Sequence, residues 1–416
     1  MRVVVVGAGI IGVCTAWYLC EHGFEVVVLE RRDDVARETS AGNAGVIAPG
    51  YVTPWAAPGM PGKILSYLMS REAPVRFRPT VDRRQWRWVA RWLRECRLER
   101  YRVNRLRMQR LAFYSRDELH ELRTALGIDY HQSSGYLQLF RSERDLAMAG
   151  PARALLEEQA IPHRVLDADG CRAQEPALSA DTPLAGGLYL PDDESGDCLE
   201  FARALRRAAE ACGVDFRFGR QVGEILVEGG RAAGVRIGDG ERIGAAAVVV
   251  AAGPESDRLL RPAGIDLPIY PVKGYSATVP LHEGAAAPAQ ALMDEAYKTA
   301  ITPLGDRIRV SGTAEVGDAD LKPRVAALRT LLKVGRDWFP DAGRWDEASL
   351  WTGARPMLPD GPPVLGATPV PSLFLNLGHG STGWAMACGS GRVVADVVAG
   401  KQPAIDLDGL TLARYR

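Results

Sequence analysis

Near its start the chain reads Arg2-Val-Val-Val-Val-Gly-Ala-Gly-Ile-Ile-Gly-Val13, and this segment indicates the fold class. The apolar, β-branched residues 2–6 predict a short buried strand. Residues 13–22 then continue as an apolar helix, which Gly23 closes. Residues 24–29 predict a second strand that ends at Glu30. A strand, a Gly-x-Gly-x-x-Gly turn, a helix and a second strand with a terminal acid are typical of a dinucleotide-binding Rossmann-like unit.

Each glycine of this fingerprint has its own physical role. Gly7 permits the tight turn, Gly9 lets a pyrophosphate approach the backbone, and Gly12 lets the helix pack closely on the strand. The helix N-terminus offers free N–H groups to the phosphates. Glu30 is placed to accept hydrogen bonds from the adenosine ribose, and its charge disfavours NADP. The motif does not distinguish NAD from FAD. The cofactor contacts expected here are Val6, Gly7, Gly9, Ile10, Ile11, Gly12, Glu30 and Arg31.

The composition is that of an ordinary globular protein of two or three domains. The 416 residues include 51 basic and 51 acidic side chains, so the formal net charge is zero. A zero balance argues against nucleic-acid binding, which requires a basic excess. The seven cysteines form no Cys-x-x-Cys pair, which predicts free thiols in a reducing compartment. The six histidines lack metal-ligand spacing, so we expect no metal site.

Residues 71–110 form an arginine-rich segment with fourteen arginines, no lysine and four acidic residues. Arginines at 84, 87, 91 and 94 and the tryptophans at 88 and 92 recur at helical spacing. This predicts a basic amphipathic helix, followed by a second helix through Leu126. Either the arginines form a solvated face with the tryptophans packed inward, or the segment docks on an anionic membrane surface. No signal peptide or membrane span is evident, so we expect a cytoplasmic protein, with the cytoplasmic face of the inner membrane as the alternative.

Hydrophobic patterns predict the remaining elements. Helices are expected over 145–159, 198–212, 321–339 and 383–399, with Asp197 capping the second of them. Strands are expected over 136–140, 214–218, 223–227, 233–237, 245–252, 272–280, 297–303, 307–312 and 373–377. Residues 39–62 form a long irregular segment with apolar and aromatic content, which indicates a functional loop.

Longer motifs are spread over almost the whole chain. They are E-T-S-A-G-N-A-G-V-I-A-P-G-Y-V-T-P-W-A-A-P-G from Glu38, L-P-D-D-E-S-G-D-C from Leu190, Y-P-V-K-G-Y-S-A-T-V-P from Tyr270, W-T-G-A-R-P-M-L-P-D-G-P-P-V-L-G from Trp351 and N-L-G-H-G-S-T-G-W-A-M-A-C-G-S-G from Asn376. Together with the opening fingerprint, they resemble the FAD-dependent D-amino-acid oxidase superfamily, which includes glycine oxidase and sarcosine oxidase. Within it, the chain most resembles the family of bacterial D-amino-acid dehydrogenase catalytic (small) subunits.

The resemblance implies an α/β protein with two domains. One is a discontinuous FAD-binding Rossmann-like domain of the glutathione-reductase type, made of residues 1–62, 186–262 and 345–416. The other is a substrate domain with a mixed antiparallel sheet, made of residues 63–185 and 263–344. It also implies non-covalent FAD, because residues 353–358 hold no cysteine where some relatives link the flavin.

The implied activity is oxidation of D-amino acids at Cα to the imine, which hydrolyses to a 2-oxo acid and ammonia. Electrons would pass to a quinone or another respiratory-chain acceptor, with additional subunits as open partners. One alternative is a D-proline or cis-4-hydroxy-D-proline dehydrogenase that gives a cyclic imine. Another, of a different class, is a non-catalytic flavoprotein electron-relay subunit.

The chemistry needs a cation for the substrate carboxylate, a neutral amine, and donors for negative charge on the flavin. Arg355 suits the carboxylate because a guanidinium offers two parallel hydrogen bonds, and the resemblance agrees. Tyr275 is a candidate for a further carboxylate contact, with Tyr51 and Tyr297 as weaker ones, and His379 for a contact to flavin or substrate. No general base is evident. Further cofactor contacts are expected from Ser40, Asn43, Ala44, Gly45, Val222, Gly253, Gly378, Gly380, Ser381, Thr382 and Gly383.

Overall fold

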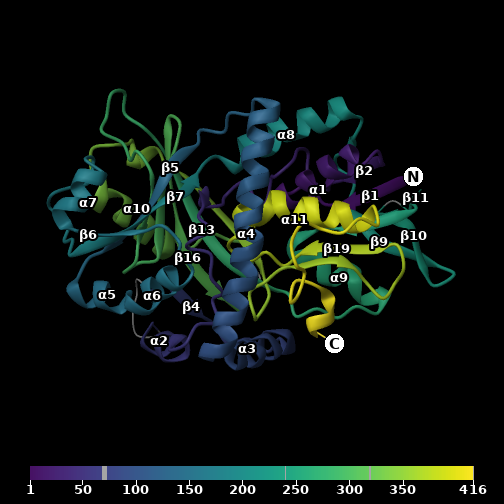
Figure 1. Ribbon diagram of the computed structural model, residues 1–416, viewed down its shortest axis with the longest axis horizontal. Helices are drawn as coiled ribbons and strands as arrows, with labels where there is room; N and C mark the ends of the chain where they lie inside the picture. Colours follow the sequence, from purple (N-terminus) through teal and green to yellow (C-terminus); the bar gives the residue numbers. More distant parts are fainter. Residues whose placement is uncertain (68–72, 239, 318–319, 416) are drawn as a thin grey trace.

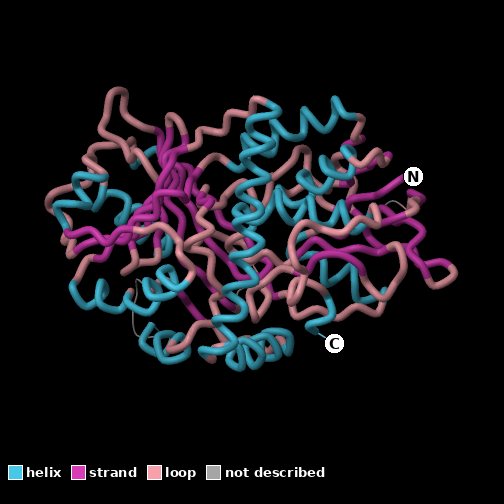
Figure 2. The backbone as a smooth tube through the Cα atoms, in the orientation of Figure 1, coloured by secondary structure: helices cyan, strands magenta, loops and turns pink. Residues whose placement is uncertain are grey.

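Two large β-sheets lie at opposite ends of the molecule, and a long helix crosses between them (Figure 1). The computed structural model describes residues 1–67, 73–238, 240–317 and 320–415. The crossing helix is α4 (Leu98–Leu126). Figure 2 shows the strands gathered into two groups, with helices around each. The first residues of the arginine-rich segment, 71 and 72, lie outside the described part.

The first group is built on a six-stranded sheet with the N-terminal strand inside it. Five of its strands run parallel, and the edge strand β18 is antiparallel to its neighbour. The two faces separate cleanly along β1, because Val3 and Val5 belong to one core while Val4 and Val6 belong to another. In spatial order the strands are β18 (Val364–Ala367), β19 (Leu373–Leu377), β12 (Ala247–Val250), β1 (Arg2–Val6), β2 (Glu25–Leu29) and β8 (Asp215–Arg217).

One face of this sheet is covered by helices and the other by a small sheet. α1 (Ile10–Glu21), α8 (Cys198–Cys212), α11 (Gly383–Val398) and α4 share the core that contains Val3 and Val5. On the other face lie the antiparallel strands β9 (Val222–Glu228), β10 (Arg231–Ile237) and β11 (Arg242–Gly244). Short helices complete this half: α9 (Ser256–Leu260), η1 (Gly253–Glu255), η2 (Arg261–Ala263) and η4 (Leu412–Tyr415).

The second group is a ten-stranded mixed sheet, mostly antiparallel. Its order is β17 (Ser349–Met357), β13 (Tyr270–Pro280), β16 (Arg307–Val316), β15 (Thr299–Leu304), β14 (Ala291–Asp294), β5 (Ser133–Phe140), β7 (Gly186–Ser195) and β3 (Val46–Ile47). β4 (Val75–Phe77) pairs with β16, and β6 (Arg164–Asp167) pairs with β7. The helices of this half are α2 (Met60–Tyr67), α3 (Arg83–Glu95), α5 (Glu143–Met148), α6 (Gly150–Glu158), α7 (Ala168–Gln174), α10 (Val325–Trp338) and η3 (Trp345–Glu347). The predicted fold class is confirmed.

The strands β7 and β17 belong to the ten-stranded sheet, although both lie in ranges predicted for the cofactor domain. Residues 186–262 and 345–416 are predicted to belong to the cofactor domain, but each range begins in a segment that contains a strand of the ten-stranded sheet. Both strands end where the chain crosses to the other half. The substrate-side sheet therefore extends to about Ser195 and Met357.

Two predicted helices also differ in their limits, for reasons of local chemistry. The helix expected over 145–159 is divided into α5 and α6 at Gly150 and Pro151, because proline lacks the N–H that would continue the first helix. The helix expected from Leu321 begins only at Val325, after Pro323. Proline disfavours helical geometry in the residue before it.

The prediction that all seven cysteines are free was wrong. Cys20 on α1 and Cys212 at the end of α8 form a disulfide across 192 residues of chain. These two helices pack side by side on the six-stranded sheet, and the sequence spacing gives no sign of it. The remaining five cysteines are free. No group of described residues has the three His, Cys, Asp or Glu side chains needed to hold a metal ion.

Two of the three tryptophans of α3 point inward. Trp88 and Trp92 are buried and stack with ring centroids 6.4 Å apart. Trp88 also donates to the Met357 carbonyl at 3.0 Å, which ties α3 to β17. Trp86 stays 47% exposed among the arginines. Among the described residues, no helix has both the length and the apolar character of a membrane span.

Candidate active site

One cavity of about 1470 Å³ runs between the two sheets and is lined by both. Small-molecule sites usually measure about 300–1,000 Å³, so this cavity has room for more than one small ligand. Its walls come from the N-terminal fingerprint, the loop over residues 37–60, β13, β16 and β17, and the start of α11.

The fingerprint forms a close-packed cradle at one end of the cavity. Gly7 has φ +101°, and a Cβ there would lie 2.7 Å from the Ala251 carbonyl oxygen. A Cβ on Gly12 would collide with the Gly7 carbonyl, so the third glycine brings helix and strand together as predicted. Glu30 accepts hydrogen bonds from the N–H groups of Ala8 at 2.7 Å and Arg32 at 2.9 Å. A carboxylate has about four acceptor positions, so Glu30 retains capacity for a ligand.

The loop after the fingerprint is held by its own polar side chains. Ser40 Oγ accepts from the Ile10 N–H at 3.1 Å, and Asn43 Oδ1 accepts from the Gly45 N–H at 2.6 Å. Arg309 on β16 donates to the carbonyls of Ala41 and Asn43, both at 2.9 Å. The side chains of Ser40 and Asn43 therefore shape the loop, a role that sequence reasoning did not foresee. Arg309 was also missed, because its position on a strand says nothing about this loop.

Most of the predicted cofactor residues line the cavity. Those that do are Val6, Gly7, Gly9, Ile10, Ile11, Glu30, Arg31, Ser40, Asn43, Ala44, Val222, Gly253, Gly378, Gly380, Ser381, Thr382 and Gly383. Gly12 and Gly45 lie behind the wall instead. Gly45 has φ +75° and supports the turn of the loop.

Arg355, on β17, faces the cavity from the substrate-side sheet. Protein surrounds its guanidinium, and this desolvation lowers the Arg355 pKa to about 10, so the group stays charged at neutral pH. Its residue is of intermediate exposure and lines the cavity. Within the part of the chain that the structure describes, no carboxylate pairs with it. Its contacts are the Thr313 carbonyl at 3.4 Å and the Trp55 ring, whose centroid is 5.9 Å from Cζ.

Two glycines and a tryptophan, which sequence reasoning missed, shape the surroundings of Arg355. A Cβ on Gly274 would lie 2.5 Å from Arg355 Nη2 and closer still to Nη1 and Cζ, so the guanidinium lies against bare backbone. Trp351 fits against Gly42 in the same way, since a Cβ on Gly42 would collide with its ring. The motifs contained both glycines, but only the three-dimensional structure reveals which side chain each one accommodates.

His379 lines the same cavity as Arg355. The loop that carries it bridges to Met357, and the Gly380 N–H donates to the Pro356 carbonyl at 3.2 Å. Burial lowers the His379 pKa to about 3, so the imidazole is neutral at neutral pH. Its Nε2 is buried without a hydrogen-bond partner. A buried ring nitrogen without a partner is rare in native structures.

The structure separates the three predicted tyrosines. Tyr51 lines the cavity, its hydroxyl donating to Glu295 at 3.3 Å, and burial with the nearby carboxylate raises its pKa. Tyr275 lies in the core of the ten-stranded sheet and donates to Glu315 at 2.9 Å. Tyr297 packs against Arg141 and Lys333. Neither Tyr275 nor Tyr297 lines the cavity.

The residues present suit a dinucleotide that carries a flavin. The glycine cradle with its helix N-terminus suits a pyrophosphate, and Glu30 suits a ribose. At the far end, the N–H groups before α11 suit a group that gains negative charge. Arg355, which has no carboxylate partner among the described residues, leaves a charged contact for a second, smaller ligand.

Comparisons with known proteins agree with this geometry. A family model described as DAO, FAD dependent oxidoreductase, matches residues 2–397. The chain is 52% identical over 419 residues to a D-amino acid dehydrogenase of Rhizorhabdus wittichii, with the full length of both covered. It is 48% identical over 417 residues to a D-amino acid dehydrogenase of Methylobacterium radiotolerans, again at full length.

Solved structures share the fold at low identity. Glycine oxidase from Geobacillus kaustophilus superposes with a TM-score of 0.76 at 24% identity, with 99% of each chain covered. L-proline dehydrogenase from P. horikoshii superposes with a TM-score of 0.74 at 18% identity, and the match covers 100% of this chain and 97% of the other. The family match confirms the predicted FAD cofactor and oxidoreductase class. The protein thus belongs to the DAO family of FAD-dependent oxidoreductases.

Proposed function

We propose that the protein oxidises D-amino acids at Cα to the imine, which water converts to a 2-oxo acid and ammonia. The names of the two relatives at about half identity support this activity over a cyclic-amine dehydrogenase and over a non-catalytic relay subunit. The observation that carries the proposal is the charged guanidinium of Arg355, which faces the cavity with no carboxylate partner among the described residues.

Arg355 binds the substrate carboxylate through two parallel hydrogen bonds. Because protein desolvates part of the guanidinium, water competes less for this contact than it would at a free surface. Gly274 leaves the space in which the guanidinium lies flat, and Trp55 covers it from the loop. These contacts fix the acid end of the substrate and so orient its Cα.

His379 lines the cavity near the amine end in this proposal. Its imidazole is neutral, so it adds no positive charge beside the substrate nitrogen. The amine proton passes to water, so a separate base is not required. Loss of a hydride from Cα and a proton from nitrogen leaves the C=N bond of the imine. When bound, FAD supplies the acceptor of that hydride and its two electrons.

Different residues of the cavity would hold different parts of FAD. Gly7, Gly9 and the N-terminus of α1 would receive the pyrophosphate, with Glu30 on the ribose. The loop over residues 40–44 and the segment 378–383 would hold the flavin end, which is non-covalent in this proposal. The positive end of α11 stabilises negative charge there.

Anaerobic mixing with D- and L-amino acids tests the activity. We expect D-alanine to bleach the flavin absorbance of the purified holoenzyme, while L-alanine leaves it unchanged. Ammonia and pyruvate should then form in a 1:1 ratio. A flavin that no D-amino acid bleaches would overturn the proposal. Bleaching by D-proline alone, without ammonia release, would favour the cyclic-amine alternative.

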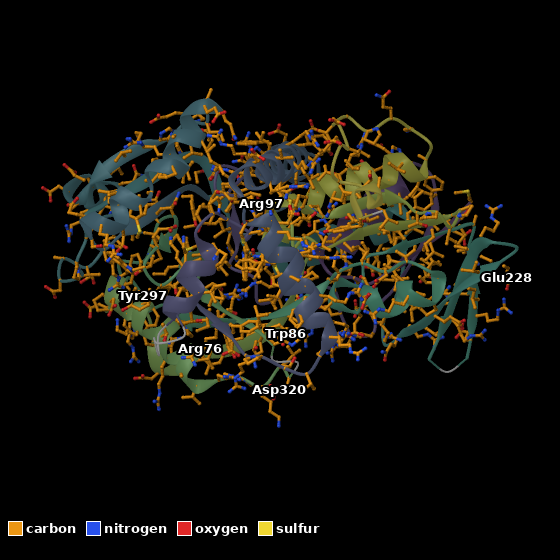
Figure 3. The ribbon with its side chains drawn as sticks, turned by 90° about the horizontal axis from the view of Figure 1, so that it is seen from below. Arg76, Trp86, Arg97, Glu228, Tyr297 and Asp320 are labelled. Atoms are coloured by element: carbon orange, nitrogen blue, oxygen red, sulfur yellow. A yellow bond between two sulfur atoms is a disulfide. The ribbon has the colours of Figure 1, made fainter. Side chains whose placement is uncertain are left out.

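We also propose that the electrons leave to a quinone at an anionic membrane surface, against which α3 docks. Figure 3, which views the molecule from below, faces this helix and labels Trp86 and Arg97. Apolar side chains are exposed among the arginines: Leu93 on α3 is 47% exposed, and Leu98 at the start of α4 is 54% exposed. Exposed apolar residues set in a basic helix are typical of interfacial membrane binding.

Sedimentation with lipid vesicles tests the docking. The holoenzyme should pellet with vesicles containing anionic phosphatidylglycerol and not with neutral phosphatidylcholine. Raising the salt from about 50 mM to about 500 mM should release it, because surface charge is screened. Trp86→Ser should weaken the association, whereas Val227→Ser, an exposed apolar site on β9, serves as the control. Equal pelleting with both lipids, or none with either, would contradict the docking.

A further inference from the structure

A second buried arginine lines the same cavity. Arg105 projects from α4, the helix that crosses between the two sheets, and its side chain is only 4% exposed. The sequence offers fourteen arginines in this segment, and the flanking Arg102 and Arg107 are more exposed. The reaction proposed above makes no use of Arg105.

The charge of Arg105 is not compensated by the described part of the chain. It forms no ion pair with any described carboxylate, and its Nε is buried without a hydrogen-bond partner. Its remaining contacts are the Gly50 carbonyl, 3.5 Å from Nη2, and the nearby Tyr101 hydroxyl. Asp193 accepts the Gly50 N–H at 3.2 Å but is not within ion-pair distance of Arg105. Burial lowers the Arg105 pKa.

A buried cation without a counterion is costly, and native proteins normally pair it. The guanidinium is also too basic to lose its proton, so it stays charged. Because Arg105 lines the cavity, an anion bound inside the cavity can supply the missing charge.

The loop between Gly50 and Trp55 connects the surroundings of Arg105 with those of Arg355. Arg105 contacts the loop at Gly50, and Arg355 lies against Trp55. Five residue steps of extended chain span at most about 18 Å, and a turn over residues 48–52 shortens this path. Thr53 ties the loop to α4 through a 2.9 Å hydrogen bond with Tyr101. Both arginines therefore contact the same loop and line the same cavity.

We infer that Arg105 binds a carboxylate on the side chain of the substrate, so that acidic D-amino acids are preferred over their uncharged amides. This inference rests on the proposed function and narrows its substrate class. Arg355 takes the α-carboxylate, and Arg105 takes the distal one.

The test compares each acid with its amide, which has nearly the same shape. The kcat/KM values for D-aspartate, D-glutamate and D-2-aminoadipate are divided by those for D-asparagine, D-glutamine and the aminoadipate amide. For the native holoenzyme we expect the acid-to-amide ratio to exceed 1 and to be largest at one chain length. Arg105→Met should lower the largest acid-to-amide ratio of kcat/KM by about ten- to a hundredfold. This is the usual range for a hydrogen-bonded charged contact. Arg105→Lys should restore part of it.

Arg102→Met is the matched control. Arg102 also lines the cavity from α4, but its side chain is exposed, so its loss tests long-range charge alone. The acid-to-amide ratio of kcat/KM for Arg102→Met should stay within threefold of the native ratio. Binding of glutarate and butyrate, followed by flavin absorbance, gives a second readout without turnover. Arg105→Met should weaken glutarate relative to butyrate by the same factor.

The outcomes separate this inference from the proposed function. If D-alanine is oxidised but the native enzyme prefers the amides at every chain length, Arg105 does not bind a side-chain carboxylate. An Arg105→Met ratio equal to the native one would overturn the inference as well. If no D-amino acid reduces the flavin, the proposed function itself fails.

Discussion

Replacing Gly274 with alanine should disable the carboxylate site without touching the substrate directly. The new Cβ would lie 2.5 Å from Arg355 Nη2, whereas ordinary contacts begin at about 3.4 Å. The guanidinium therefore has to retreat by about 1 Å, which is easy because it is the end of a flexible side chain. Gly274 does not have a positive φ, so alanine fits the backbone of β13. We expect the variant to fold normally, with the Arg355 guanidinium displaced from its native position.

The size of the effect follows from this displacement. A misplacement of about 1 Å in a positioning group costs about a hundredfold in rate. We therefore expect kcat/KM for D-alanine to fall by about a hundredfold, or about 2.8 kcal/mol at 1.4 kcal/mol per tenfold. FAD content and the thermal unfolding temperature should stay close to the native values, because the collision involves only Arg355.

The assay is steady-state oxidation of D-alanine with a dye acceptor, with Gly223→Ala as the matched control. Gly223 also lies in a strand, but a Cβ there would meet nothing closer than the Arg236 carbonyl at 3.7 Å. The double variant Gly274→Ala/Arg355→Met should be no worse than Arg355→Met alone, since both changes act through one guanidinium. An activity of Gly274→Ala within threefold of native, or additive losses in the double variant, would refute the reasoning.

Three further predictions concern other groups. Arg355→Met should lower kcat/KM for D-alanine by about 30- to several-thousand-fold, the range for a buried charge pair that loses one partner, and a smaller loss would contradict its role. The lowered pKa of His379, about 3 against about 6.5 unfolded, means that stability rises with pH in that window. Going from pH 7 to 5 should therefore cost about 2 kcal/mol in urea unfolding through this group, and His379→Asn should lose correspondingly less; equal losses would contradict its burial as a neutral group. Alkylation of the denatured, unreduced protein should modify five cysteines by mass spectrometry, and seven would exclude the Cys20–Cys212 disulfide.

The cofactor half could be predicted from sequence because its signals are local. The glycine fingerprint, the strand β1 and the terminal Glu30 all fall within the first thirty residues. The helices α8 and α11 were also foreseen closely, since each has a sharp amphipathic or glycine boundary. Short-range chemistry of this kind needs no knowledge of distant partners.

The substrate side could be predicted only in part, because it depends on which face of a strand each residue takes. Successive side chains alternate along β13, so Tyr275 enters the core next to Glu315 while Gly274 faces Arg355. The motif placed both in the right strand but did not give its orientation. Strand β17 was missed because Thr-Gly-Ala-Arg-Pro has no strand pattern, although it pairs with β13 over nine residues.

The buried arginine of the arginine-rich segment could not be predicted from sequence either. Fourteen arginines share the segment over residues 71–110, and nothing in their spacing distinguishes the buried Arg105 from its exposed neighbours. Only the path of α4 across the loop at Gly50 brings that one side chain to the cavity.

The position of α11 has a consequence for biosynthesis. Its first residues and the preceding loop close the cavity, yet they lie 371 residues after Gly12. At about 5–20 residues per second, the ribosome needs about 20–75 s to deliver them after the fingerprint has been made. Strand β19 must also insert beside β12 before the N-terminal sheet is complete. FAD binding thus requires the completed polypeptide, and chains that end before residue 376 should carry no flavin and be colourless.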